Sequence, residues 1–277
     1  MTDGEEFSAL PGSREGNPLP LLAAAAQVPL YADPGCEPPR VLDQVQSWAA
    51  QLRLRLAPDA SALARLRLLN HFFFVELGFA GAGDDYQSVD NSYLHRVIER
   101  RRGIPITLSL LYIELGRAAG LHLQGMSFPG HFLVRLSLHG GAVVIDVFGG
   151  GVTLSPEVLR ERLRATLPEA ADPPLAPYLQ AASDREILAR LLRNLKVIHW
   201  QKQQWAAALE VVNRLIAVAP EAAAERLDRA QLYEHLDCPR AAIADLETYL
   251  SLSGPAPGVA DVRRRLARLQ LAASRLH

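Results

Sequence analysis

Apolar residues recur every three or four positions through the first part of the chain, the spacing produced by a helix with one buried face. The clearest run places apolar residues at Leu63, Leu66, Leu69, Phe73 and Leu77, and the glycine-containing stretch 78–83 ends it. We expect helices at Leu19–Gln27, Val41–Leu56, Ala60–Leu77, Ser92–Arg101 and Thr107–Ala119. Gly120 stands where a left-handed cap residue ends the last of these helices.

The period of the apolar residues then changes from helical spacing to the alternation typical of strands. Short strands are expected at Leu121–Met126, His131–Leu138 and Ala142–Phe148, the last two joined by a turn at residues 139–141. The glycines at 149–151 are expected to end the sheet. This order of elements predicts an α+β domain with a small antiparallel sheet.

The last third of the chain is helical throughout and contains an internal repeat. A shift of 34 residues places Ala208 on Ala242 and Val212 on Leu246, which is the period of a tetratricopeptide helix pair. The match is imperfect, because two leucines of the first unit fall on arginines of the second. A third helical stretch, Gly258–Leu271, is expected to cap the exposed end of the repeats.

A proline-rich stretch separates the two parts, with prolines at 168, 173, 174 and 177. We therefore expect residues 1–17 to be disordered, 18–165 to form the α+β domain, 166–180 to be a linker and 181–277 to form the helical domain.

Composition narrows the classes of function. The net charge is −1, so no strong field of one sign is available to recruit nucleic acid or an anionic membrane. The apolar stretch Leu19–Val28 is too short to span a bilayer and follows acidic residues. Cys36 and Cys238 form no disulfide framework, which is typical of a reducing compartment. We expect a cytoplasmic protein that binds neither nucleic acid nor membrane.

Candidate chemistry lies where the helical region meets the predicted strands. His131 begins one strand and Asp146 ends the next, so a hairpin would bring the two side chains onto adjacent rungs. Helix, His-bearing strand and Asp-bearing strand is the order of a papain-like transglutaminase core, which needs a thiol at the start of the helix. The chain has no cysteine there. The histidines at 122, 131 and 139 lack metal-ligand spacing, so neither a metal nor another cofactor is expected.

Several motifs in order resemble the bacterial SirB-type transglutaminase-like family. They are Phe72–Phe74, Asn91–Leu94, Val97–Arg100, Arg102–Ile106, Pro129–Arg135, Ile145–Gly151 and Arg193–Lys196. The similarity covers most of residues 40–252, and it implies a papain-like domain followed by tetratricopeptide-like helices.

The resemblance also implies where a nucleophile would stand. In active relatives the cysteine begins the helix that ends in a glycine like Gly120, and the matching position here falls near Pro105. His131 and Asp146 would then form a vestigial dyad, with Ser109 and Thr107 the nearest hydroxyls. Loss of the nucleophile from such a constellation typically lowers kcat by ~10⁶.

Three hypotheses stay open. The leading one is a non-catalytic pseudoenzyme, an interaction or regulatory protein whose repeats bind a protein or peptide partner. The alternative is a hydrolase or acyltransferase that uses Ser109 or Thr107 with His131 and Asp146. The third is a pocket that only captures a small ligand or peptide. Tyr112 and Arg102 are the candidate binding residues, and His131 is open to a purely structural role as well.

Overall fold

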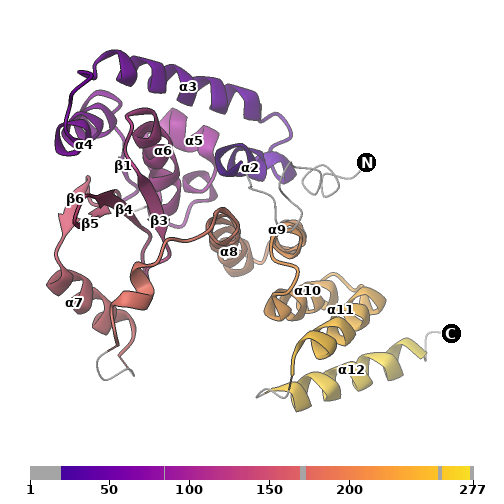
Figure 1. Ribbon diagram of the computed structural model, residues 1–277. Coiled ribbons are helices and arrows are strands. Elements are labelled where there is room, and N and C mark those ends of the chain that lie inside the picture. The colour runs from indigo at the N-terminus through magenta and orange to yellow at the C-terminus, as the bar shows by residue number, and fades with distance from the viewer. Residues whose placement is uncertain (1–19, 84, 169–172, 255–257, 275–277) are drawn as a thin grey trace. The chain divides into compact units, whose positions relative to one another are not determined.

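The computed structural model describes residues 20–83, 85–168, 173–254 and 258–274 (Figure 1). Within these ranges the chain forms two compact units. The first contains Pro20–Pro29 and Gly35–Ile187, and the second contains Leu30–Pro34 and the chain from Leu188 onward. Helices with a small antiparallel sheet make up the first unit and helices alone the second, which confirms the predicted fold class. The expected disorder of residues 1–17 lies outside the described residues.

Each helix that the apolar spacing predicts in the first unit is found near its expected position, with ends shifted by a few residues, whereas α7 (Pro156–Thr166) was not predicted. The helical segments that precede the antiparallel sheet in the chain are α2 (Leu21–Gln27), η1 (Val28–Tyr31), α3 (Pro38–Leu54), α4 (Ala62–Asn70), η2 (His71–Glu76), η3 (Val89–Asn91), α5 (Leu94–Arg100) and α6 (Pro105–Ala118). The most buried of them is α6, which places eleven of its residues in the core. It begins at a proline, whose fixed φ suits the first helical turn.

One predicted helix is not regular. The expected single helix Ala60–Leu77 continues beyond Asn70 as the π-helix η2, in which the N–H of Leu77 donates to the carbonyl of Phe72 at 2.9 Å. The extra residue in this turn changes the direction of the side chains that follow. Phe73 consequently lies in the core, stacked on Phe79 with 4.6 Å between ring centroids.

The sheet is a four-stranded antiparallel meander rather than the predicted three strands. Its strands are β3 (Leu123–Met126), β4 (Leu133–Leu138), β5 (Gly141–Asp146) and β6 (Val152–Leu154). The prediction that residues 149–151 end the sheet is wrong, because these glycines form the turn into β6. Gly151 adopts a φ of +78° there, a value that glycine reaches without strain. With only three residues, β6 has too short an alternation to recognise in the sequence.

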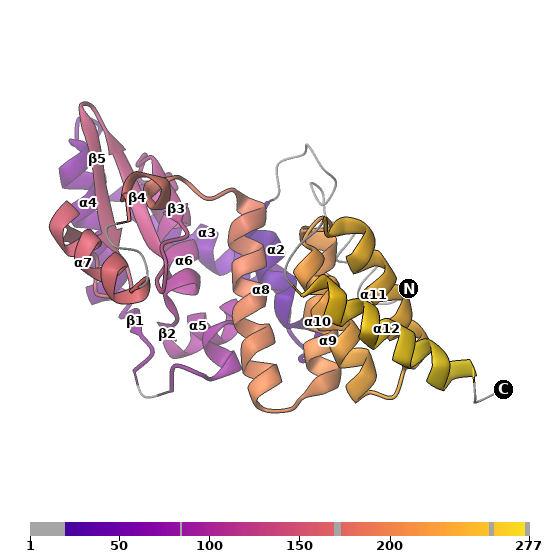
Figure 2. The ribbon, with the colours of Figure 1, turned by 90° about the horizontal axis from the view of Figure 1, so that it is seen from below.

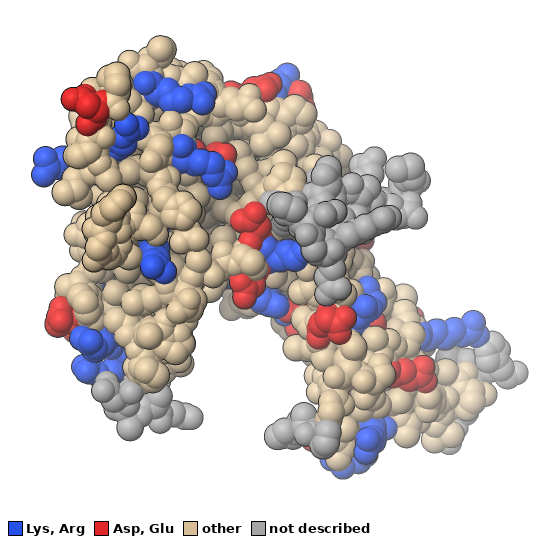
Figure 3. Space-filling model, viewed as in Figure 1, with Lys and Arg blue, Asp and Glu red and all other residues tan. Residues whose placement is uncertain are grey.

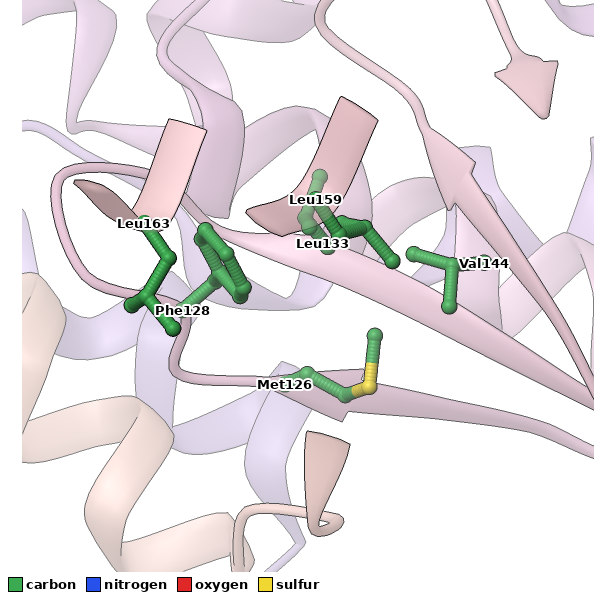
Figure 4. Close-up of a cluster of buried hydrophobic side chains, with 6 residues drawn as sticks. All are labelled: Met126, Phe128, Leu133, Val144, Leu159 and Leu163. Carbon is green, nitrogen blue, oxygen red and sulfur yellow. The ribbon is translucent and has the colours of Figure 1, made fainter. Parts of the chain in front are cut away.

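Helix α7 (Pro156–Thr166) covers one face of this sheet. Figures 1 and 2 both place α7 and α6 on opposite sides of the strands. The helix points its leucines at the strands, where they close a buried cluster of Met126, Phe128, Leu133, Val144, Leu159 and Leu163 (Figure 4). The register pairs Val134 with Ile145, so these two side chains point to the opposite face of the sheet. Side chains alternate along a strand, and Leu133 and Val144 therefore share the face that α7 covers. Two further strands, β1 (Ala80–Gly81) and β2 (Arg102–Gly103), pair in parallel.

The second unit contains two helix pairs followed by a single helix. They are α8 (Asp184–Gln201), which enters this unit at Leu188, and α9 (Trp205–Val218), α10 (Ala223–His235), α11 (Pro239–Leu252) and α12 (Val259–Ser274). Ala208 and Ala242, equivalent in the 34-residue repeat, are both fully buried where paired helices touch. Helix α12 packs its buried Val262 against the second pair, in the place expected for a cap.

The mismatch between the two repeats has an electrostatic explanation. In α8, Leu192 and Leu195 are fully buried. Their equivalents in α10 are arginines, and Arg229 donates to both oxygens of Asp245 on α11 at 2.6 and 2.7 Å. An ion pair thus replaces the apolar contact of the first repeat, which is why the repeat is weak in the sequence.

Residues 30–34 belong to the second unit although they precede the sheet by many residues. The Tyr31 hydroxyl bonds to Nε2 of the buried His199, and the other ring nitrogen of His199 lies 2.7 Å from the Gln204 amide oxygen. An amide oxygen only accepts, so Nδ1 carries the hydrogen and Nε2 accepts from the phenol. Burial lowers the pKa of His199, which favours this neutral form.

No helix of the described residues is both long and apolar enough to cross a membrane. Basic and acidic side chains are interspersed on the face drawn in Figure 3, in keeping with the small net charge. The same described ranges contain no group of three or more His, Cys, Asp or Glu side chains that could hold a metal ion.

Candidate functional site

The β4–β5 hairpin brings His131 and Asp146 together, although fifteen residues separate them in sequence. His131 lies two residues before β4 and Asp146 is the last residue of β5. Nε2 of the His131 ring lies 2.8 Å from Oδ1 of Asp146. The imidazole is therefore held by a carboxylate, the arrangement that orients the histidine in papain-like and serine-type triads.

The Asp146 carboxylate is nearly completely buried and fully hydrogen-bonded. Its side chain is 5% exposed, Oδ1 also accepts from the backbone N–H of Gly149 at 3.0 Å, and Oδ2 accepts from Arg162 at 2.9 Å. Burial alone would raise the pKa of Asp146, but the hydrogen bonds from His131, Gly149 and Arg162 outweigh it and lower the pKa to about 2. Asp146 is consequently ionised at neutral pH, which leaves the Nε2 hydrogen on His131.

Arg162 is a site residue that the sequence did not reveal. It stands on α7 three residues after Leu159 and next to Leu163, the two leucines that seat the helix on the sheet. Residues three and four apart share a helix face, so packing of the leucines aims Arg162 at the end of β5. The sequence feature that could have indicated Arg162 is its position beside the apolar residues of α7. A charged side chain at a partly buried position usually has a partner of opposite charge.

Phe148 connects His131 with the segment that leads into α6. Its ring meets the His131 ring edge-on, with 6.0 Å between centroids. The same ring lies so close to Gly81 that a Cβ there would stand 2.7 Å from its Cε2 atom. Gly81 pairs with Gly103, two residues before Pro105, so the imidazole and the start of α6 belong to one region.

The Thr107 hydroxyl bonds to backbone groups at the start of α6. Its fully buried Oγ1 accepts from the N–H of Ile104 at 3.1 Å and lies 2.8 Å from the carbonyl of Asn91, to which it donates. Thr107 is the N3 residue of α6, and its hydroxyl reaches back to the N–H of the N-cap residue Ile104, so it caps the helix and ties it to the preceding segment.

Ser109 is also fully buried, and in the described part of the chain its Oγ has no hydrogen-bond partner. Neither hydroxyl is therefore bonded to the His131 ring, the contact that a serine or threonine nucleophile needs for activation.

The two candidate binding residues lie in different surroundings. Tyr112 is fully buried, its hydroxyl donates to the Oδ1 of Asn70, and burial raises its pKa. Asn70, which the sequence did not indicate, in turn donates to the carbonyl of Gly151 at 3.4 Å and so supports the turn after Asp146. Arg102 is exposed and donates to the carbonyls of Gly78 and Arg101 at 3.1 and 2.9 Å. The structure does not bring these two residues together.

Two substitutions on α6 separate the roles of its hydroxyls. Thr107→Val removes the hydroxyl and leaves the N–H of Ile104 and the carbonyl of Asn91 only their long mutual hydrogen bond of 3.4 Å, so it is expected to lower the free energy of unfolding by about 1–2 kcal/mol. Ser109→Ala removes an unbonded hydroxyl and is expected to change it by less than about 0.5 kcal/mol. Urea denaturation of the full chain followed by circular dichroism measures both. Equal losses for the two variants would contradict the assignment of the cap to Thr107.

Comparison with known proteins agrees with this architecture. The profile described as Transglutaminase-like superfamily matches residues 39–193, and the profile described as Tetratricopeptide repeat matches residues 195–271. A UPF0162 protein of Xylella fastidiosa (strain Temecula1) is 36% identical over 253 residues, which cover 91% of this chain and 90% of the relative.

Other relatives are more distant. A UPF0162 protein of Pseudomonas aeruginosa is 34% identical over 256 residues, covering 92% of this chain and 91% of the relative. Protein SirB1 of Salmonella typhimurium is 26% identical over 211 residues, covering 76% of this chain and 78% of the relative. No solved structure matches the chain. On the extent of these matches, the chain belongs to the transglutaminase-like superfamily and to the UPF0162 family, and it carries tetratricopeptide repeats after its transglutaminase-like domain.

Proposed function

We propose that this protein is a cytoplasmic interaction and regulatory protein, in which a transglutaminase-like domain without its nucleophile is joined to a partner-binding repeat scaffold. The observation that carries the proposal is the start of α6. A proline occupies its first position, the Thr107 hydroxyl is used as a cap, and the Ser109 hydroxyl has no bond to the imidazole. Hydroxyls without a base are not ionised at neutral pH, so these positions favour a binding role over acyl transfer.

The second unit supplies the binding half of the proposal. Repeat helices stack into a solenoid whose concave surface can receive a peptide, and we assign the first helix of each pair to that surface. Here these helices are α8 and α10, and Lys196 on α8 donates to Glu225 on α10 at 2.8 Å. The ion pair holds the two helices side by side. Val197, the next residue on α8, is 50% exposed, an apolar side chain left at the surface.

A matched pair of variants tests whether α8 binds the partner. Val197→Asp and Val152→Asp change two valines that are equally exposed, one on α8 and one on β6 of the other unit. We expect a partner captured by the tagged full chain to be lost with Val197→Asp and retained with Val152→Asp, because a buried carboxylate disrupts an apolar contact. Identical capture by both variants and the wild type would contradict partner binding on α8.

The alternative, a hydrolase or acyltransferase, is favoured by one observation only. An ionised Asp146 holds the His131 ring, as a general base requires. A hydroxyl-directed acyl probe distinguishes the two functions. The interaction protein should show no labelling that depends on His131, with exposed His122→Ala as the control for His131→Ala. Labelling that disappears in His131→Ala alone would replace our proposal with the alternative.

A further inference from the structure

A second pair of reactive side chains lies in the first unit and shares no residue with the His131 site. Cys36 is 8% exposed and precedes Glu37, the residue at the N-cap of α3. Its Sγ lies 3.5 Å from Nδ1 of His95, the second residue of α5. Fifty-nine residues separate the two in sequence, so only the packing of the helices brings thiol and imidazole together.

The surroundings of Cys36 favour its thiolate form. An imidazole within hydrogen-bond reach either takes the thiol proton or, once protonated, stabilises the anion. The start of α3, a helix of seventeen residues, adds the partial positive charge of its backbone dipole. Burial acts in the opposite direction, because it disfavours the charged form. With Nδ1 of His95 in contact, we expect the two favourable effects to win.

The charged residues that adjoin the pair in sequence form ion pairs on their own helices. Glu37 bonds to Arg40 at 2.8 Å on α3, and Arg96 bonds to Glu99 at 3.0 Å on α5. The His95 ring lies parallel to that of the buried Tyr93, at an interplanar angle of 13° and a centroid distance of 6.1 Å. This stacking holds the half-buried imidazole in place beside the thiol.

The other cysteine of the chain is a built-in control. Cys238 is exposed at the N-cap of α11, and its Sγ lies 3.4 Å from the carbonyl of Leu236. A carbonyl oxygen accepts the thiol hydrogen in a hydrogen bond but, unlike an imidazole, it is not a base that takes the proton away. The two thiols therefore share a helix start and differ in having a base or an acceptor as neighbour.

We propose that Cys36 is a covalent modification site, activated by His95, that takes small disulfides of the glutathione type. The Cys36 sulfur attacks one sulfur of the disulfide, the disulfide bond breaks, and a new mixed disulfide forms at Cys36. The departing thiolate takes the proton that His95 received from the Cys36 thiol. No further oxidant is consumed, since the incoming disulfide is itself reduced.

The test uses full-length Cys238→Ser, which keeps Cys36, and full-length Cys36→Ser, which keeps Cys238. Alkylation by iodoacetamide is measured as a function of pH, because the pH at half-maximal rate reports the thiol pKa independently of access. We expect Cys36 to reach half-maximal rate at least one pH unit below Cys238. Adding His95→Asn to Cys238→Ser should raise the midpoint of Cys36 and leave circular dichroism unchanged, with His95→Gln as the substitute if the asparagine variant misfolds.

Reaction with glutathione disulfide, followed by mass spectrometry, tests the proposed ligand. At pH 7 we expect one glutathionyl group on Cys36 and a rate lowered about fivefold or more by the His95 substitution. A Cys36 midpoint equal to or above that of Cys238, a midpoint unmoved by the loss of His95, or failure of Cys36 to react in the folded chain would each overturn the proposal.

Discussion

Replacing Phe73 with alanine is expected to lower the free energy of unfolding of the protein by about 3–5 kcal/mol, the range for a buried phenylalanine. The ring is fully buried, is stacked on Phe79 at 4.6 Å and meets Tyr112 edge-on at 5.4 Å. A cavity among rigid aromatic rings collapses poorly, so the loss should lie in the upper part of the range. Urea denaturation of the full chain, followed by circular dichroism, measures it.

The same π-helix contains a matched control. Val75, two residues after Phe73, is 67% exposed, so Val75→Ala is expected to change the free energy of unfolding by less than about 0.5 kcal/mol. Similar losses for Phe73→Ala and Val75→Ala would show that η2 does not direct Phe73 into the core. A large loss for Phe73→Ala alone supports the direction that the π-helical turn imposes.

Asp146→Asn is the second substitution with a large expected effect. The pKa of Asp146 is lowered from 3.8 to about 2, which corresponds to about 2 kcal/mol of stability at neutral pH. Because the pKa is lower in the folded state, the unfolded chain takes up the proton first as the pH falls. This contribution is therefore complete above pH ~4 and is lost between pH ~4 and ~2.

The expected result is a gap in free energy of unfolding between wild type and Asp146→Asn that is widest near pH 7 and narrows towards pH 3. Asp43→Asn, at an exposed position of α3, is the control and should show no gap. A gap that does not change with pH would mean that the loss comes from shape or packing rather than from the charge of Asp146. Loss of the carboxylate also removes the group that orients the His131 ring.

Much of the fold could be predicted from the sequence because the signals are local. Helices such as α3 and α6 need only an apolar stripe within one window of residues, and the 34-residue repeat needs only a comparison of the chain with itself. The pairing of His131 with Asp146 was predictable for the same reason. The two residues belong to one hairpin, whose register is set by the alternation of its own residues.

Other site features could not be predicted, since they depend on contacts between distant elements. The sequence does not show that the Ser109 hydroxyl has no hydrogen-bond partner while the Thr107 hydroxyl is bonded to the backbone. Only the packing around α6 decides this difference. The β6 strand and the π-helical turn at η2 are too short to produce a period. Neither segment contains enough residues for a repeating pattern of apolar positions to be recognised.

The amino-acid sequence by itself determined the two-part architecture, the order of helices and strands, and the presence of an imidazole and a carboxylate in one hairpin. Tertiary structure alone decided that Arg162 completes the bonding of Asp146, that Asn70 joins Tyr112 to the turn at Gly151, and that Cys36 meets His95. The reason is physical. The spacing of apolar residues can be recognised within a short window of the sequence. Side chains from helices that are distant in sequence come into contact only when the core packs.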